Sequence, residues 1–154
     1  LGAGTSLNTW SFPMKKHVAA LSASAPSYAW VKTDAGRSES QRPRQKNDCT
    51  VRALASARGL TYDEAYDELK QAGRKCGRGF AIQVWLNAQP WALKLPFPAV
   101  KGERRMNPVT FVAQFPLGNF ICRSSKHVFA VIDGKVLDEV KIRGDRCIYT
   151  AWRV

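Results

Sequence analysis

The sequence is poor in the residues that support metal binding and disulfide formation. Its 154 residues include only two histidines and four cysteines, and no two cysteines have the short CxxC spacing of a metal-binding or redox pair. A zinc site made of Cys76, Cys122, His127 and Cys147 would contain a single close pair of ligands, so the sequence favours neither a metal nor another cofactor. The low cysteine density favours a reducing compartment, in which a free thiol persists.

Acidic residues are also scarce, since 12 of them stand against 24 basic residues and leave a net charge of +12. Such a chain favours polyanions, which makes nucleic acid or an acidic protein a candidate partner of its surface. No apolar run approaches the roughly 20 residues that cross a bilayer, and the apolar stretch after Met14 is too short for a signal peptide. We therefore expect a soluble protein with no membrane contact, in the cytoplasm or associated with a virion.

The length and the 45% hydrophobic content suit one globular domain with a real core. Residues 1–43 are rich in serine, alanine, glycine and proline and show no sustained periodicity. Four aromatic residues, Trp10 and Trp30 among them, nevertheless lie in this segment. We expect an extended, partly ordered arm that packs on the domain or on a protein partner, followed by the compact domain over residues 44–154.

The first part of this domain is predicted to be helical. Asn47 or Asp48 can cap a helix through its side-chain oxygen, and that helix carries Cys49 in its opening turn. Gly59 is expected to end it. The pattern of residues 61–64, Thr-Tyr-Asp-Glu, is that of a capping box and predicts a second helix. Further elements are expected as a short helix over 80–88, an extended or edge-strand segment over 91–100 and a helix over 107–115.

The second part alternates short runs of β-branched and aromatic residues with turn signals, which is typical of an antiparallel sheet. Residues 133–134, Asp-Gly, are a strong signal for a two-residue hairpin loop. That register pairs Ile132 with Lys135 and makes His127 and Asp138 diagonal neighbours on one face. Helices packed on such a sheet make an α+β domain. The expected strands cover residues 120–123, 127–132, 135–140 and 147–154.

These residues are the ones that a thiol nucleophile requires. A helix N-terminus and a neighbouring imidazolium each lower the pKa of a thiol, and Cys49 has the first and would gain the second from His127. With only one other histidine in the chain, the choice of base is nearly forced. Asp138 would fix the orientation of the imidazole, and Asp145 is the competing orienter, although its position in an Arg-Gly-Asp turn favours pairing with arginines.

The oxyanion of an acyl intermediate also requires hydrogen-bond donors. The backbone N–H of Cys49 and the side chain of Gln45 are candidates, with Asn47 and Gln41 as substitutes for Gln45. Without its downstream partners, Cys49 would be interpreted as a small buried hydrophobic residue of a helix.

Four segments in this order resemble the papain-like cysteine peptidase superfamily: residues 45–49, 118–121, 127–131 and 136–138. Within it, the chain is most similar to the bacteriocin-processing C39-type peptidases and to small C39-like domains encoded by phages and bacteria. The resemblance covers residues 44–138 and implies a nucleophile-bearing helix packed on an antiparallel sheet, a peptide or isopeptide substrate and no metal. It implies Cys49 as nucleophile, His127 as general base and acid, Asp138 as orienter and Gln45 as oxyanion donor.

Two positions depart from the C39-type pattern, in which glycine follows the cysteine and proline follows the last carboxylate. This chain has Thr50 and Glu139 there. The sequence therefore supports two functions. The first is hydrolysis of a peptide or isopeptide bond by a Cys-His-Asp triad through a thioester. The second is a catalytically silent structural or binding protein of the same fold, a virion or nucleic-acid-associated component that uses its basic surface and its arm.

Overall fold

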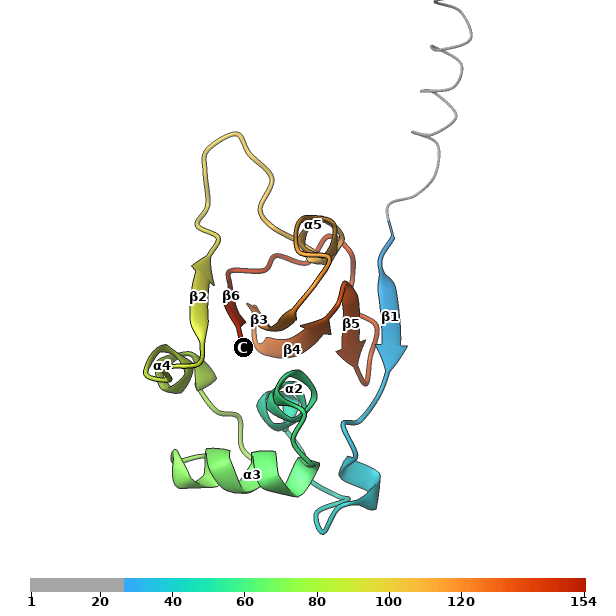
Figure 1. Cartoon of the computed structure of the whole chain (residues 1–154), viewed down its shortest axis with the longest axis vertical. Helices are drawn as coiled ribbons and strands as arrows, with labels where there is room; N and C mark the ends of the chain where they lie inside the picture. Colours follow the sequence, from blue (N-terminus) through green and yellow to red (C-terminus); the bar gives the residue numbers. More distant parts are fainter. Residues whose placement is uncertain (1–26) are drawn as a thin grey trace, which may run out of the picture.

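A six-stranded sheet with helices on both faces makes up residues 27–154, the part of the chain that this computed structural model describes (Figure 1). The architecture is α+β, as predicted. In chain order the elements are β1 (Ala29–Lys32), the 3-10 helix η2 (Arg37–Glu39), α2 (Cys49–Arg58), α3 (Tyr62–Gln71), α4 (Ile82–Asn87), β2 (Leu93–Pro96), α5 (Pro108–Gln114), β3 (Asn119–Ser124), β4 (His127–Ile132), β5 (Lys135–Asp138) and β6 (Thr150–Arg153).

Local signals set the ends of the helices. Helix α2 begins at Cys49 and ends at Arg58. Gly59 follows it with a φ of 66°, the left-handed conformation that commonly follows a helix. The side chain of Thr61 accepts a hydrogen bond from the backbone N–H of Glu64, which confirms the predicted cap of α3. Asn107 makes a full capping box at the start of α5, with proline in the first turn. The expected helix over 80–88 is present as the shorter α4.

The hairpin of β4 and β5 has the predicted register. Ile132 pairs with Lys135 across the two-residue loop, and Ala130 pairs with Leu137 further along. Both loop residues have positive φ, 46° at Asp133 and 74° at Gly134, which is the conformation that matches the twist of the two strands. The extended segment predicted over 91–100 contains β2, which pairs with β6 at one edge of the sheet.

The sheet is mixed, whereas the sequence predicted an antiparallel one. Strand β1 pairs in parallel with β5, with Trp30 opposite Val136, and forms the other edge of the sheet (Figure 1). β1 lies inside the segment assigned to the arm, so ordered structure of the domain begins before residue 44. The prediction failed here because a four-residue strand has no measurable periodicity and its partner is distant in sequence. Residues 1–26 of the arm, with the apolar stretch after Met14, lie outside the described residues.

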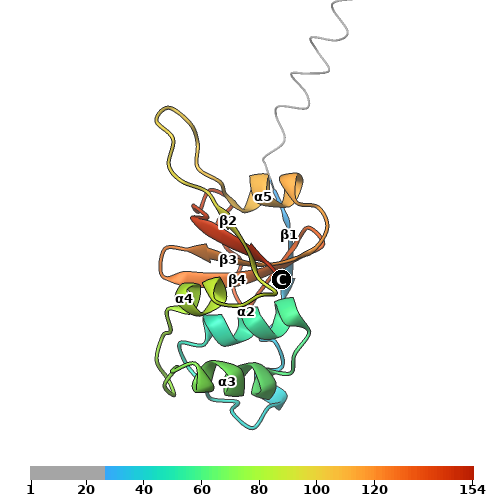
Figure 2. The ribbon, with the colours of Figure 1, turned by 60° about the vertical axis from the view of Figure 1, so that its left-hand side comes forward.

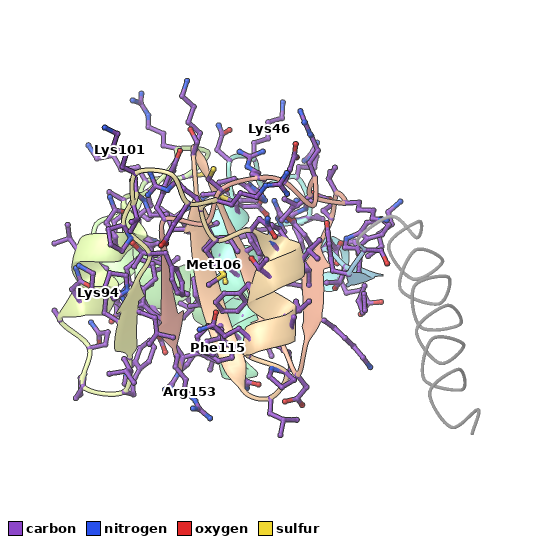
Figure 3. All side chains as sticks on the ribbon, turned by 90° about the horizontal axis from the view of Figure 1, so that it is seen from above. Lys46, Lys94, Lys101, Met106, Phe115 and Arg153 are labelled. Atoms are coloured by element: carbon purple, nitrogen blue, oxygen red, sulfur yellow. The ribbon has the colours of Figure 1, made fainter. Side chains whose placement is uncertain are left out.

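Both faces of the sheet are buried, each under a different set of helices. Figure 2 shows α2 against one face with α3 beneath it, and α5 on the other face. Alternate residues of a strand point to opposite faces. Ile121 therefore packs in the cluster with α2 and α3, and its neighbour Phe120 packs with Phe111 of α5. Met106 and Phe115, labelled beside α5 in Figure 3, cover this second cluster.

The hairpin loop gives a test of the fold. Replacing Gly134 with alanine puts a β-carbon on a residue with positive φ, which costs about 1–2 kcal/mol of unfolding free energy. Gly79→Ala is the matched control, since Gly79 has open space around it and no positive φ. Urea titration of both variants measures the difference. An equal loss in the two variants would show that the loop does not fix the register.

Candidate active site

Cys49 is the first residue of α2, and its half-buried thiol lies where this helix meets β4. The side chain of Asp48 does not cap the helix, contrary to one prediction, because its carboxylate binds Arg37, Arg52 and Tyr62. Asn47, the other predicted cap, donates its amide to the carbonyl of Gly77 at 2.8 Å. The backbone N–H groups of a first helical turn have no acceptor within the helix. They remain beside the thiol as hydrogen-bond donors.

The structure brings His127 and Asp138 into direct contact. His127 opens β4 and Asp138 ends β5, so the hairpin puts both at the end of the sheet where α2 begins. Nε2 of His127 lies 2.5 Å from Oδ2 of Asp138. Cys49 and His127 line the same two clefts, and the imidazole is close enough to the thiol to lower its pKa.

The environment of the thiol favours its ionised form. Burial raises the pKa of Cys49, but hydrogen bonds from the His127 side chain and the backbone of Val128, with the charges of His127 and Arg52, bring it below its ordinary value. Burial lowers the pKa of His127, whereas hydrogen bonds to Asp138 and Cys49 and their charges raise it to about 9. Both shifts favour a thiolate beside an imidazolium over the neutral pair.

Asp138 is 3% exposed and binds two cations through separate oxygens. Oδ2 faces His127, while Oδ1 accepts hydrogen bonds from Nη1 of Arg52 at 2.5 Å and from the backbone N–H of Glu139 at 2.7 Å. Burial alone raises the pKa of this carboxyl, but His127 and Arg52 lower it by more, so the pKa of Asp138 lies below its ordinary value. Asp138 therefore stays ionised beside the imidazole.

Arg52 links the carboxylate of Asp138 to a row of alternating charges that the sequence analysis did not identify. Its Nε lies 3.2 Å from Asp48, which also accepts the hydroxyl of Tyr62 at 2.8 Å and pairs with Arg37 at 3.1 Å. Arg37, from η2, pairs with Glu139 as well. Each charge of this row thus has an opposite partner, which is the condition for burying charged side chains. In the sequence, only the spacing of Asp48 and Arg52, one helical turn apart, could have indicated this row of ion pairs.

The edge strand β1 holds the backbone of Asp138. Two hydrogen bonds converge on its carbonyl oxygen, from the indole Nε1 of Trp30 at 3.1 Å and from the backbone N–H of Thr33 at 3.1 Å. Trp30 packs against the core cluster on the α5 face of the sheet. A segment that the sequence assigned to the arm therefore fixes the residue that holds His127.

Gln45 lies in the cleft with Cys49, but its side chain binds the loop before α4. Oε1 accepts hydrogen bonds from the backbone N–H of Gly77 at 2.6 Å and from Arg74 at 3.2 Å. Its amide nitrogen, the predicted oxyanion donor, lies 3.4 Å from the sulfur of Cys76. Of the two substitutes, Asn47 lines the same cleft with its amide bound to Gly77, and Gln41 does not line that cleft.

The alternative assignments made from the sequence do not meet at this site. Asp145 pairs with Arg143 at 2.8 Å on an exposed turn. Cys122 is buried in the core, and burial raises its pKa well above the ordinary value. Within residues 27–154, no group of three potential metal ligands comes together, and no helix is long and apolar enough to span a bilayer.

Two clefts meet at the Cys49–His127 pair. The first, of about 440 Å³, is lined by charged residues that include Arg37, Lys46 and Glu139. The second, of about 410 Å³, contains Phe80 and Val128 and the buried hydroxyl-bearing Thr50, whose Oγ1 has no hydrogen-bond partner among the described residues.

Comparisons with protein-family models, with curated proteins and with solved structures find no match for this chain. The papain-like and C39-like resemblance therefore depends on the residues themselves and their spacing.

The protonation of His127 gives a direct test of the site. We expect its imidazole to titrate near pH 9 in proton NMR, because Asp138 and the Cys49 thiolate stabilise its charged form. Asp138→Asn should move the midpoint down toward the ordinary value of about 6.5. The chain has one other histidine, so the His127→Gln variant assigns the two resonances. A wild-type midpoint near 6.5 would contradict the described contacts.

Arg52 can be tested through stability. Arg52→Met keeps the length of the side chain but leaves Asp48 and Asp138 without their shared cation, and we expect the free energy of unfolding to fall by about 3 kcal/mol. Lys70→Met on the exposed side of α3 serves as control, with an expected change below about 0.5 kcal/mol. Chemical denaturation measures both. Equal effects of the two substitutions would mean that the buried ion pairs make no contribution to the free energy of unfolding.

Proposed function

We propose that the chain is a papain-like cysteine hydrolase of peptide or isopeptide bonds, most similar to the C39-type peptidases. The observation that carries this proposal is that Cys49 and His127 line the same two clefts and that His127 binds Asp138. In this proposal the three residues act as nucleophile, base and orienter, the three parts that covalent catalysis of this kind requires. A nucleophile at the start of a helix that packs on the sheet bearing the base supports the papain-like assignment.

The reaction begins with attack of the Cys49 thiolate on the substrate carbonyl carbon, which forms a C–S bond and a tetrahedral oxyanion. His127, as imidazolium, then donates its proton to the leaving nitrogen, and the C–N bond breaks to leave a thioester. Neutral His127 next accepts a proton from water as that water attacks the thioester. The C–S bond breaks, and the products are a carboxylic acid and the free thiolate beside the imidazolium.

The oxyanion requires donors near the sulfur. The backbone N–H of Cys49 belongs to an uncapped first turn of α2, and the partial positive charge of a helix N-terminus favours an anion there. Gln45 is the proposed side-chain donor, and to serve it must exchange its contact with the sulfur of Cys76 for one with the substrate. Asp138 takes no part in bond making and holds the imidazole in its reactive orientation.

Thiol labelling tests the proposal without knowledge of the substrate. We expect iodoacetamide to alkylate Cys49 faster than an ordinary thiol at the same pH, because its pKa is lowered, and His127→Ala to slow that alkylation at least about tenfold. Mass spectrometry of the digested protein quantifies each cysteine. Cys76 is the internal control, since its pKa is lowered by Gln45 and Tyr66 rather than by His127, and its labelling should not change in the variant.

The pH dependence of hydrolysis gives a second measure, with a quenched-fluorescent peptide library as substrate. The value of kcat/KM should rise as the Cys49 thiol ionises, at a pH below its ordinary pKa, and fall through about 9 as His127 loses the proton that the leaving group needs. Asp138→Asn should move the alkaline limb to lower pH. Cys49 labelling that does not depend on His127, together with absent hydrolysis, would favour the catalytically silent binding protein.

That second function has one observation in its favour. No lysine between residues 27 and 154 forms an ion pair with another described residue, so these ammonium groups are available to an acidic partner such as nucleic acid. The contacts of Cys49, His127 and Asp138 are not explained by polyanion binding. We therefore place hydrolysis first.

A further inference from the structure

A third cleft, of about 320 Å³, also opens at His127, and its charged lining is wholly basic. Lys126 and Arg146 line it together with Lys141 and Arg143, and no carboxylate is among its lining residues. Lys126 lies next to His127 in the chain and lines all three clefts around the site. A ligand that enters from any of them therefore meets the same ammonium group.

The charges of this third cleft are mostly uncompensated. Lys126 and Lys141 are exposed and form no ion pair with any residue from 27 to 154. Arg146 binds the hydroxyl of Ser124 at 3.0 Å and the carbonyl of Ser125 at 2.5 Å, both of which are uncharged. Only Arg143 has a carboxylate partner, Asp145. The guanidinium of Arg146 is thus held in place with its charge available.

The first cleft has acidic residues, but they are already neutralised. Asp48 and Glu139 both bind Arg37, and each lies within 4 Å of Arg52 as well. Lys46 and Lys126 are the unpaired lysines of this cleft, and Figure 3 shows Lys46 at the edge of the molecule. In the second cleft, Arg123 and Lys126 are the charged residues beside Phe80. Each of the three clefts therefore presents positive charge beside His127.

We propose that the substrate is an acidic polypeptide segment, whose Asp or Glu side chains near the cleaved bond bind Lys126, Lys141 and Arg146. This proposal rests on the function proposed above and specifies its substrate class. Carboxylates are attracted to unpaired cations in an exposed setting, and the surrounding positive field also speeds their approach. We expect two such contacts to favour an acidic over a neutral segment by about tenfold, which corresponds to about 1.4 kcal/mol for the two together.

The lining of the third cleft favours a polypeptide over a nucleic acid. Single-stranded nucleic acids bind where basic grooves are combined with aromatic platforms for base stacking. The third cleft contains no aromatic residue other than the imidazole of His127, and its apolar side chains are the aliphatic Val140 and Ile142. Lys126 also shares two clefts with the thiol of Cys49, the proposed nucleophile, whose chemistry is directed at carbonyl carbon.

Matched affinity labels test the charge preference apart from turnover. Chloroacetyl-Asp-Glu-Gly-amide and chloroacetyl-Asn-Gln-Gly-amide each alkylate a thiolate, which displaces chloride and forms a C–S bond. In the full chain at low ionic strength, we expect the acidic label to modify Cys49 about tenfold faster. The ratio should approach one in the Lys126→Gln, Lys141→Gln double variant, and also in 1 M salt, where the Debye length is about 3 Å.

Lys94→Gln is the control, since Lys94 lies on β2 at the sheet edge opposite β1 and should leave the ratio unchanged. Equal rates for the two labels, with modification that still depends on His127, overturn the acidic substrate and leave the proposed hydrolase intact. Modification that does not depend on His127 overturns the hydrolase and this inference with it. If a single-stranded oligonucleotide blocks both labels and the acidic one is not preferred, nucleic acid is the polyanion and the inference is wrong.

Discussion

The candidate site depends on one buried carboxylate that two cations share. Asp138 holds His127 of β4 with one oxygen and Arg52 of α2 with the other. A buried carboxylate is stable only with such partners, and in this position it fixes the helix and the sheet relative to each other. Arg52 also pairs with Asp48, and Asp48 pairs with Arg37, so these residues hold one another in place. The orientation of one imidazole thus follows from residues in three separate parts of the chain.

Much of this arrangement could be predicted because its determinants are local. The Asp133-Gly134 loop sets the register of β4 and β5, and that register alone brings His127 and Asp138 to the same end of the hairpin. Gly59 and Thr61 mark the boundary between α2 and α3 with equal clarity. Turn and cap residues act within a few positions of themselves, so a single sequence is sufficient to recognise them.

The parts that could not be predicted depend on tertiary contacts. Asp48 has the side chain of a helix cap, yet its carboxylate binds Arg37, Arg52 and Tyr62, because a buried anion gains more from cations than from backbone N–H groups. Gln45 is in the right cleft, but its amide is held by a loop that the sequence did not connect with it. In each case the residues that bind the side chain lie far away in sequence or belong to no recognisable sequence motif.

The parallel edge strand has a consequence for the order of folding. Pairing of β1 with β5 joins positions 29 and 135, so it closes a loop that contains nearly every other described element. Contacts of such high sequence separation are entropically costly and form slowly, whereas α2, α3 and the β4–β5 hairpin can form from short-range contacts. During folding, His127 and Asp138, which the hairpin joins, can therefore meet before Trp30 and Thr33 secure the backbone of Asp138. Reactivity at the thiol would then appear as one of the last events of folding, after the surrounding domain has become compact.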